Sequence, residues 1–378
     1  MKTANIGLDI FYMNIRFLKS DELCDGINEL PFSFPLVILS KNGAERWGLA
    51  SFFAKQHQNN SLLWYSNTDN NPTQESVCEL LDFSRNHIVD GIIAIGGGSV
   101  IDLAKSFSAF HGMQGIDSPQ SVLEAIVGKT YLANSHNAMQ IVAVPTTAGT
   151  GSEVTEWATI WGTDGKSKYS IDAPWLKPDK AWIVPQLLST LPQKLMLATG
   201  LDAVCHAVEA YWAKASNPIS KALSIRSLDI MTRNLKSGLN NLRDELVIES
   251  LCTGSLLAGL AFSMTRTTAC HSISYPLTYM FGMEHGFAAA VTLAQVAESN
   301  SAVCDISELL DLFARYNGIQ NWLDDVCGGI VELRLSFFGI EKHDIATIAS
   351  NCFTAGRMDN NPADLSMETV MEILESVY

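Results

Sequence analysis

The sequence predicts an α/β domain followed by an all-α domain, and three observations lead to this prediction. The chain has 378 residues, more than the ~250–300 at which single cores stop growing, so two domains are expected. The first half alternates short apolar runs with helical patterns. Long segments rich in Ala and Leu, with helical periodicity, dominate after about residue 190. We therefore expect domains at 1–190 and 191–378.

The expected strands of the first domain are apolar runs rich in β-branched residues, at 35–40, 61–66, 91–96 and 140–145. Helical patterns lie between them, one beginning near Gln74 and another near Val100. Short buried strands separated by helices indicate a doubly wound, mostly parallel, Rossmann-like sheet. In the second half we expect helices over 194–214, 218–240, 245–275, 286–300 and 306–317.

The composition is that of a globular protein, with 47% apolar and 17% charged residues. The formal net charge is −15 without any basic run, so neither nucleic acid nor an anionic membrane is an expected partner. We expect no signal peptide, because the first residues lack an apolar core. We expect no transmembrane helix, because strongly apolar runs fall short of ~18 residues. The eight cysteines form no CxxC pair, which favours reduced thiols in a cytoplasmic protein.

A glycine-rich loop follows one of the expected strands. In GIIAIGGGSVIDLAKSF, residues 96–99 stand between a strand and a helix. Glycines at a strand end let backbone N–H groups approach a ligand, and the N-terminus of the following helix favours a phosphate. The spacing is not GxGxxG, so taken alone this loop is equally compatible with an ordinary βα turn.

A second loop makes the ligand-binding interpretation stronger. In QIVAVPTTAGTGSEVT, small hydroxyl residues and glycines follow another expected strand. Ligands of open α/β sheets lie outside the carboxyl ends of the strands. Two such loops on one sheet suit a molecule with two phosphates, which suggests a dinucleotide.

Four residues of the second half are candidate metal ligands. Asp202 and His206 are four residues apart and share one face of a helix. Each has another interpretation, Asp202 as a helix N-cap and His206 as a hydrogen-bonded core histidine. His271 and His285 would lie ~21 Å apart on one continuous helix, too far to share an ion.

The chain between these two histidines contains Pro276 and Gly282, both of which can break a helix. A turn at these residues would bring His285 back beside His271. One carboxylate and three imidazoles suit Fe(II) or Zn(II) without selecting between them.

Together these motifs resemble the iron-containing (group III) alcohol dehydrogenase family. The matching segments are GGGSVIDLAK (96–105), PTTAGTGSEVT (145–155), GLDAVCHAVEAYWA (200–213) and the His271/His285 pair. They occur in the order of the family and make the match cover most of the chain. The resemblance implies a dinucleotide-binding domain packed on a helical domain, an architecture like that of dehydroquinate synthase.

The resemblance also implies roles for single residues. The implied metal ligands are Asp202, His206, His271 and His285. The implied cofactor positions are Gly97, Gly98, Ser99 and Asp102 in the first loop, Thr146, Thr147 and Thr150 in the second, and Thr159 and Lys168 beyond it. Lys168, in DGKSKYS, is also compatible with a surface lysine.

Two positions depart from the family pattern. Ser40 stands where members that prefer NAD commonly carry an acidic residue, and Lys41 follows it. A 2′-phosphate is therefore acceptable there and Lys41 can attract it, so NADP is favoured over NAD. Ser40 is also compatible with a plain strand end that discriminates weakly. Tyr275 stands where many members have a second histidine that moves a proton. A tyrosine there can donate a proton, although its reference pKa of ~10 suits the role less well, and it is also compatible with packing.

Arg266 is the only formal charge between Glu249 and Glu284. The segment TRTTACHSISYPLT looks most like the branch that reduces phosphonoacetaldehyde, and a guanidinium binds a phosphonate well. An internal salt bridge to Glu209 or Glu156 is an equally good interpretation of Arg266.

The sequence therefore predicts a metal-dependent, NAD(P)-linked alcohol dehydrogenase or aldehyde reductase, which the resemblance implies to be a homodimer or a larger oligomer. Two alternatives stay open. One is a metal- and NAD-dependent lyase of the dehydroquinate synthase type, which needs more cationic residues around its substrate. The other is a relative that binds nucleotide without catalysis.

Overall fold

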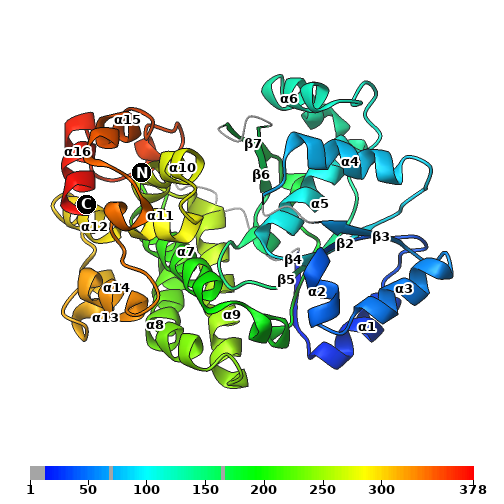
Figure 1. Ribbon diagram of the computed structural model, residues 1–378, viewed down its shortest axis with the longest axis horizontal. Coiled ribbons are helices and arrows are strands. Elements are labelled where there is room, and N and C mark those ends of the chain that lie inside the picture. The colour runs from blue at the N-terminus through cyan, green and yellow to red at the C-terminus, as the bar shows by residue number, and fades with distance from the viewer. Residues whose placement is uncertain (1–12, 68–70, 163–166) are drawn as a thin grey trace. The chain divides into compact units, whose positions relative to one another are not determined.

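The structure is a computed structural model that describes residues 13–67, 71–162 and 167–378. They form two compact units (Figure 1). The first unit holds the described residues up to Thr146 and most of those between Ser152 and Leu187. The second holds Leu188–Tyr378 together with Thr147–Gly151. The second glycine loop therefore packs with the helical unit, although the strand before it belongs to the sheet.

The first unit is built on a six-stranded sheet whose order is β1-β8-β5-β4-β2-β3. Its strands are β1 (Asn14–Phe17), β2 (Leu36–Ser40), β3 (Leu63–Asn67), β4 (Ile92–Gly96), β5 (Ile141–Pro145) and β8 (Lys180–Ile183). All neighbouring strands run parallel. The antiparallel pair β6 (Trp157–Trp161) and β7 (Lys168–Asp172) stands apart from this sheet. The expected α/β fold is confirmed, and β2 to β5 are the four expected strands.

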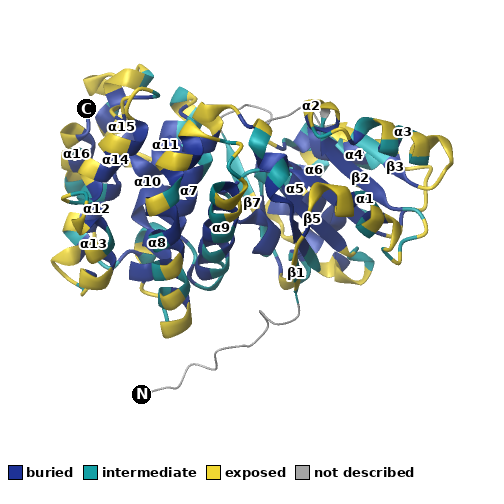
Figure 2. Cartoon of the chain, turned by 90° about the horizontal axis from the view of Figure 1, so that it is seen from below, coloured by how far each residue is buried: buried dark blue, intermediate teal, exposed yellow. Residues whose placement is uncertain are grey.

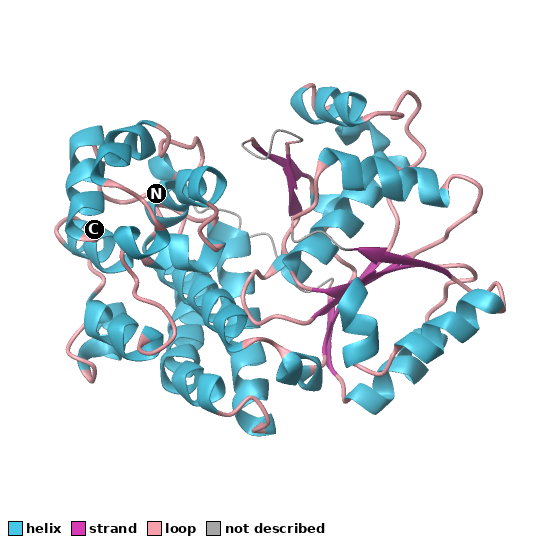
Figure 3. Ribbon diagram, viewed as in Figure 1, coloured by secondary structure: helices cyan, strands magenta, loops and turns pink. Residues whose placement is uncertain are grey.

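Helices cover both faces of the sheet (Figure 3). They are α1 (Ser20–Asn28), α2 (Lys41–Arg46), α3 (Ala50–Gln58), α4 (Gln74–Ser84), α5 (Gly98–Phe110) and α6 (Pro119–Val127). Side chains alternate between the faces of each strand. Leu36 and Ile38 belong to one apolar cluster with residues of α4 and α5, whereas Val37 and Leu39 belong to another with Leu23 and Phe53. Two apolar cores thus hold the sheet between two helical layers.

The regular elements of the second unit are all helices over its described residues. It contains α7 (Gln193–Trp212), α8 (Pro218–Asn240), α9 (Glu245–Thr265), α10 (Ala269–Phe281), α11 (His285–Ala290), α12 (Leu293–Ser301), α13 (Ser307–Ala314), α14 (Ile319–Cys327), α15 (Ile345–Ser350) and α16 (Met367–Ser376). Residues 200–212 of α7 are buried without exception, and Figure 2 shows this helix in the colour of buried residues. Because the predicted metal ligands Asp202 and His206 lie on α7, they lie in a dry interior.

One helix among the described residues, α9, is long and apolar enough to cross a membrane by length and composition alone. In its most apolar window 56% is buried, and it packs against α7 and α8. A core helix of a globular protein has these same properties. Each of the eight cysteines, all within the described residues, is a free thiol.

The expected helix over 245–275 is wrong as a single element, because the chain breaks at residues 266–268 between α9 and α10. Arg266 causes this break by adopting φ 62° and ψ 179°. Pro276 does not end a helix as expected, but lies inside α10. The turn occurs at Gly282, whose φ of 66° is a left-handed conformation that glycine adopts without strain. The expected helix over 286–300 is likewise divided into α11 and α12.

Close backbone contact places α11 against α7. A Cβ built on Gly286 would overlap the carbonyl oxygen of Ala198 in α7. Since the obstacle is backbone, it cannot move aside as a flexible side chain can. We expect Gly286→Ala to lower the free energy of unfolding by about 1–3 kcal/mol, the usual cost of overpacking, and to displace the adjacent His285.

Urea denaturation checks this expectation, with Gly26→Ala as the matched control. A Cβ on Gly26, within α1, meets the ring of Trp182 at 3.4 Å and a methyl group of Leu18 at 3.9 Å, both ordinary contacts, and alanine has the higher helix propensity. The control should therefore be neutral or stabilising. Equal stability of Gly286→Ala and the wild type would show that α11 does not depend on this contact.

Candidate metal centre and cofactor loops

One face of α7 carries three ionisable side chains. Asp202, His206 and Glu209 occupy positions i, i+4 and i+7, which lie on one side of a helix. Their exposed fractions are 4%, 5% and 0%. The N-cap interpretation of Asp202 is wrong, because α7 begins after Pro192 and Asp202 lies in its middle.

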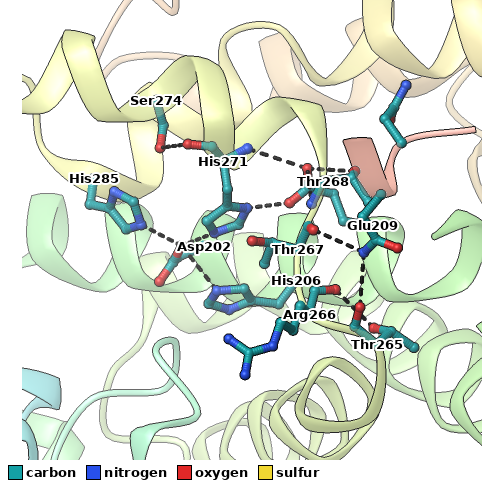
Figure 4. A network of polar contacts seen from close by, with 12 residues as sticks. Asp202, His206, Glu209, Thr265, Arg266, Thr267, Thr268, His271, Ser274 and His285 are labelled. Atoms are coloured by element: carbon teal, nitrogen blue, oxygen red, sulfur yellow. Dashed lines mark hydrogen bonds and ion pairs between the residues drawn. The ribbon is translucent and has the colours of Figure 1, made fainter. Parts of the chain in front are cut away.

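Three imidazoles converge on a single oxygen of Asp202 (Figure 4). The Nε2 atoms of His206, His271 and His285 lie 3.8, 3.3 and 3.9 Å from Asp202 Oδ1. The donor atoms of Asp202, His271 and His285 all lie within 4.8 Å of one another. The turn at Gly282 thus brings His285 back beside His271. Three of the four expected ligands form one close group, and His206 approaches that group at Asp202.

Two buried polar atoms at the centre of this cluster lack a hydrogen bond to any described residue. Asp202 Oδ1 and His271 Nε2 are fully buried and have no hydrogen-bond partner of acceptable geometry among the described residues. Buried polar atoms cost free energy unless they are paired. A cation bound between them would satisfy both, so the residues present fit the metal that the sequence predicts.

The pKa values of two ligand candidates are lowered for different reasons. Burial lowers the pKa of His206 to about 4, although the Asp202 carboxylate opposes this effect. Burial alone would raise the pKa of Asp202, but the surrounding imidazoles hold it well below its usual range. The carboxylate is therefore ionised and the His206 imidazole neutral at physiological pH, the forms that bind a metal.

His206 is held from its other side by the second glycine loop. Its Nδ1 lies 3.2 Å from the carbonyl oxygen of Gly149. Its ring stacks on Phe262 at 4.0 Å and on His271 at 4.5 Å between centroids. The Gly149 contact settles which nitrogen of His206 is directed at Asp202. The sequence gives no signal for it, because any residue type supplies a backbone carbonyl.

His271 lies between two carboxylates. Its Nδ1 contacts Glu209 Oε2, while its Nε2 faces Asp202. Burial alone would lower the pKa of His271, but Glu209 and Asp202 raise it to about 10. This part of the site therefore demands a positive charge, whether as a proton or as a metal. From the sequence, Glu209 is expected only as a salt-bridge partner of Arg266, although its i+7 spacing from Asp202 is a signal of its place in the cluster.

The remaining ligand candidate, His285, is the more open one. Its side chain is 36% exposed, and the ring of Tyr275 lies parallel to it at 6.2 Å between centroids. Tyr275 is therefore next to the cluster, where the sequence predicts either a proton donor or a packing residue.

Arg266 occupies the break between α9 and α10 with strained backbone. Its φ of 62° and ψ of 179° fall in a region that is essentially restricted to glycine. Such a conformation costs about 1–3 kcal/mol and is found mainly at functional sites. The carboxylate of Glu209, one of the two expected ion-pair partners, accepts hydrogen bonds from Thr268 and His271.

The carboxyl ends of β4 and β5 bring the first glycine loop beside the start of the second. The two strands pair in register up to Gly96 and Pro145, and the backbone N–H of Thr146 donates to Gly96 O at 3.0 Å. A Cβ on Gly96 would overlap Val100 at the start of α5, so this position requires glycine. Gly97 is the N-cap of α5, and Gly98 and Ser99 form its first turn.

Asp102 is engaged in a buried network that joins α5 to the segment after the second loop. Its Oδ1 accepts from Ser152 Oγ at 2.5 Å, and its Oδ2 accepts from the Thr159 N–H at 2.9 Å. Lys105, completely buried, donates to Ser152 Oγ, Thr155 Oγ1 and Trp157 O. Burial lowers the pKa of Lys105 to about 8. Two of the expected cofactor positions, Asp102 and Thr159, are thus bonded to each other.

The other expected cofactor residues are divided between the two units. Ser40 ends β2 and precedes α2, as the strand-end interpretation requires. The side chain of Lys41 lies outside the described part of the chain. Thr146 is buried, and Lys168 begins β7. Thr147 and Thr150 belong to the loop that packs with the helical unit.

Glu153 makes the stability of this network depend on pH. It is 3% exposed, and burial raises its pKa from 4.5 to about 7. The folded protein therefore holds this proton more tightly than the unfolded chain does. The resulting contribution to the free energy of unfolding is complete below pH 4.5 and is lost as the pH rises through 7. The free energy of unfolding of Glu153→Gln, relative to that of the wild type, should rise by up to about 3 kcal/mol between pH 5 and pH 8.

Urea denaturation at both pH values measures this gain. Glu79→Gln, at an exposed position, is the control and should stay within about 0.5 kcal/mol of the wild type at both pH values. A constant difference between Glu153→Gln and the wild type would contradict the assignment of this titration to Glu153.

Two family descriptions match the chain one after the other. "Iron-containing alcohol dehydrogenase" matches residues 19–185, and "Fe-containing alcohol dehydrogenase family, C-terminal" matches residues 196–378. Only the first residues and the junction between the units lie outside these matches.

Individual relatives agree with this assignment. A phosphonoacetaldehyde reductase of Streptomyces viridochromogenes is 35% identical over 62% of this chain, and the match spans 59% of that protein, less than two thirds of its length. An NADPH-dependent butanol dehydrogenase of Clostridium saccharobutylicum is 28% identical over 81% of both chains. The crystal structure of a sulfoacetaldehyde reductase from Bifidobacterium kashiwanohense in complex with NAD+ shares the fold, with a TM-score of 0.82, 23% identity and 97% coverage of both chains. The chain belongs to the iron-containing alcohol dehydrogenase family and is an oxidoreductase of that family.

Proposed function

We propose that this protein is a metal-dependent, NAD(P)-linked reductase of short aldehydes that carry an anionic group. The observation that supports the metal is the convergence of three imidazole Nε2 atoms on Asp202 Oδ1 in a buried cluster. Asp202, His206, His271 and His285 would hold the ion. Three nitrogens and one oxygen suit Fe(II) or Zn(II), and the match to the iron-containing family favours Fe(II).

The residues of the chain would bind the metal, the substrate and the cofactor and orient them. When bound, the metal supplies Lewis-acid polarisation of the substrate oxygen, and the nicotinamide supplies the hydride. Residues 200–212 of α7 exclude water from one side of the ligand cluster, which strengthens electrostatic interactions there. The half-open side of the cluster is at His285 and Tyr275. The hydroxyl of Tyr275 would give a proton to the product oxygen.

The cofactor would bind at the carboxyl ends of β4 and β5, where ligands of parallel sheets bind. The first loop and the N-terminus of α5 suit phosphates, since α5 is a 13-residue helix preceded by Gly97. Ser40 at the end of β2 offers no carboxylate against a 2′-phosphate, which favours NADP. The NADPH-dependent butanol dehydrogenase relative agrees with this choice, whereas the sulfoacetaldehyde reductase was crystallised with NAD+.

Arg266 would select the substrate. A guanidinium forms two-pronged hydrogen bonds with phosphonate or sulfonate oxygens. Its strained backbone is the kind of feature that persists where function requires it. The relative that is 35% identical is a phosphonoacetaldehyde reductase, which supports phosphonoacetaldehyde as the first substrate to test.

A lyase of the dehydroquinate synthase type fits less well. Such a reaction needs several cations around a polyhydroxylated phosphate, and the sequence from Glu249 to Glu284 supplies Arg266 alone. We further propose that residues 1–190 are the dinucleotide-binding domain and residues 191–378 the metal- and substrate-binding domain. A homodimer or larger oligomer in the cytoplasm is the expected form.

The test of this function is the oxidation of NADPH and NADH by Fe(II)-reconstituted protein. We expect turnover of phosphonoacetaldehyde with NADPH that is lost on chelation and recovered with Fe(II). Asp202→Asn should bind no metal and show no turnover, because it removes the negative charge on which the imidazoles converge. Metal-loaded protein that oxidises neither cofactor with any aldehyde of the panel would contradict the proposal.

A substitution at Arg266 tests the substrate class. Arg266→Gln should lower kcat/KM for phosphonoacetaldehyde by about 10–100-fold, the value of a charge-assisted hydrogen bond. It should leave kcat/KM for butanal unchanged. Arg226→Gln, which breaks a surface ion pair to Asp229, is the control and should change neither.

The alternative role of Arg266 as an internal salt bridge makes a different prediction. Breaking such a bridge would lower the free energy of unfolding and leave the ratio of the two substrates unchanged. Arg266→Gly distinguishes the hypotheses further, because glycine adopts the observed φ without strain. If Arg266 serves the substrate, this variant should be at least as stable as the wild type while losing selectivity.

A further inference from the structure

The carboxylate of Glu209 is completely buried, yet the proposed chemistry gives it no direct role. It lies on α7 seven residues after Asp202, on the same face of the helix. An ionised carboxylate in such a position is costly unless its oxygens are fully hydrogen-bonded. Its contacts account for this requirement.

Glu209 accepts four hydrogen bonds from the start of α10. Oε1 accepts from Thr268 N at 3.1 Å, Thr268 Oγ1 at 2.8 Å and His271 N at 3.3 Å. Oε2 accepts from His271 Nδ1. Trp212 Nε1 in turn donates to Thr268 Oγ1 at 2.8 Å. The carboxylate thus caps the N-terminus of α10 and also holds one imidazole nitrogen.

An ionised carboxylate can only accept hydrogen bonds. The hydrogen of a neutral His271 must therefore be on Nδ1, and the lone pair on Nε2. This Nε2 faces Asp202 Oδ1 at 3.3 Å, and both atoms are buried without a hydrogen bond to any residue that the structure describes. Two acceptors in this arrangement repel each other unless a cation lies between them.

We propose that Glu209 is a positioning residue that fixes His271 in the Nδ1–H tautomer and so makes the cluster a site for a divalent cation. This inference rests on the proposed metal site. The charges at the site also support this inference. Asp202 and Glu209 together carry two negative charges, which one divalent ion would balance, and unbalanced charge in a protein interior is costly. Outer-shell carboxylates that hold a ligating histidine act in this way in general.

The decisive variant is Glu209→Gln. The glutamine oxygen can still accept from the Thr268 and His271 N–H groups, but its amide nitrogen then faces His271 Nδ1. The hydrogen of the imidazole would move to Nε2, the nitrogen required for the metal. We expect a folded protein whose Kd for Zn²⁺ and Co²⁺, measured by competition with a chelator, is about 10–100-fold weaker.

Thr268→Val is the matched control. It removes the hydroxyl that joins Trp212 to Glu209 but leaves the carboxylate, the Thr268 N–H and the His271 contact. We expect lower thermal stability in this variant without a change in Kd for either metal. Equal Kd values for Glu209→Gln and the wild type, or an equal weakening in both variants, would overturn the inference and leave Glu209 as a helix cap.

A measurement on the wild type decides the case even where Glu209→Gln does not fold. In zinc-loaded protein with ¹⁵N-labelled histidine, the NMR signals of His271 should show the hydrogen on Nδ1 and the metal on Nε2. A hydrogen on Nε2 would overturn the role of Glu209 while metal binding by the other ligands stood. Failure of the wild type to bind either metal would overturn the proposed metal site and this inference together.

Discussion

The structure of the helical unit is governed by two carboxylates that lie on one face of a buried helix. Asp202 and Glu209 are almost completely shielded from water, so their charge must be balanced nearby. Three imidazoles lie around them and would hold the proposed cation that balances this charge: His271 contacts both carboxylates, and His206 and His285 approach Asp202. Because each partner comes from a different turn or helix, the charge requirement fixes how α7, α10 and α11 pack. The chemistry of the site and the packing of the unit are therefore one problem.

Such convergence requires backbones that approach closely, and glycines provide it on two sides of α7. Gly286 of α11 lies against Ala198, and Gly149 of the second loop lies against Thr199. Gly286 directly follows His285, and the contact of Gly149 directs its carbonyl oxygen at His206. A side chain at either position would separate a ligand from Asp202. The second loop thus contacts the candidate metal ligands and is also a candidate cofactor loop.

Much of the fold and part of the site follow from the sequence alone. The buried strands β2 to β5 are continuous apolar runs, and period 3.6 identifies α7 and α8. Short β1 and β8 and the β6–β7 pair escape detection because their side chains are mixed in polarity and tertiary pairing decides them. The break at Arg266 is also hidden, since a positive φ at arginine contradicts local preference. The i+7 spacing of Glu209 from Asp202 indicates its helix face, but its partners Thr268 and His271 lie far along the chain, so its role is not visible in the sequence. The Gly149 carbonyl likewise contacts a residue distant in sequence, His206.

Hydrogen bonds from Asn360, near the C-terminal end of the chain, stabilise the strained backbone of Arg266. Asn360 Nδ2 donates to the carbonyl oxygens of Thr265 at 2.9 Å and Thr267 at 3.1 Å, on either side of Arg266. The Asn360 backbone carbonyl and its side-chain oxygen accept from Lys214 N and Ala215 N, just beyond α7. One asparagine therefore anchors the Arg266 turn to the end of the helix that carries Asp202. Strain persists only where surrounding contacts over-determine the conformation, and these four hydrogen bonds meet that condition.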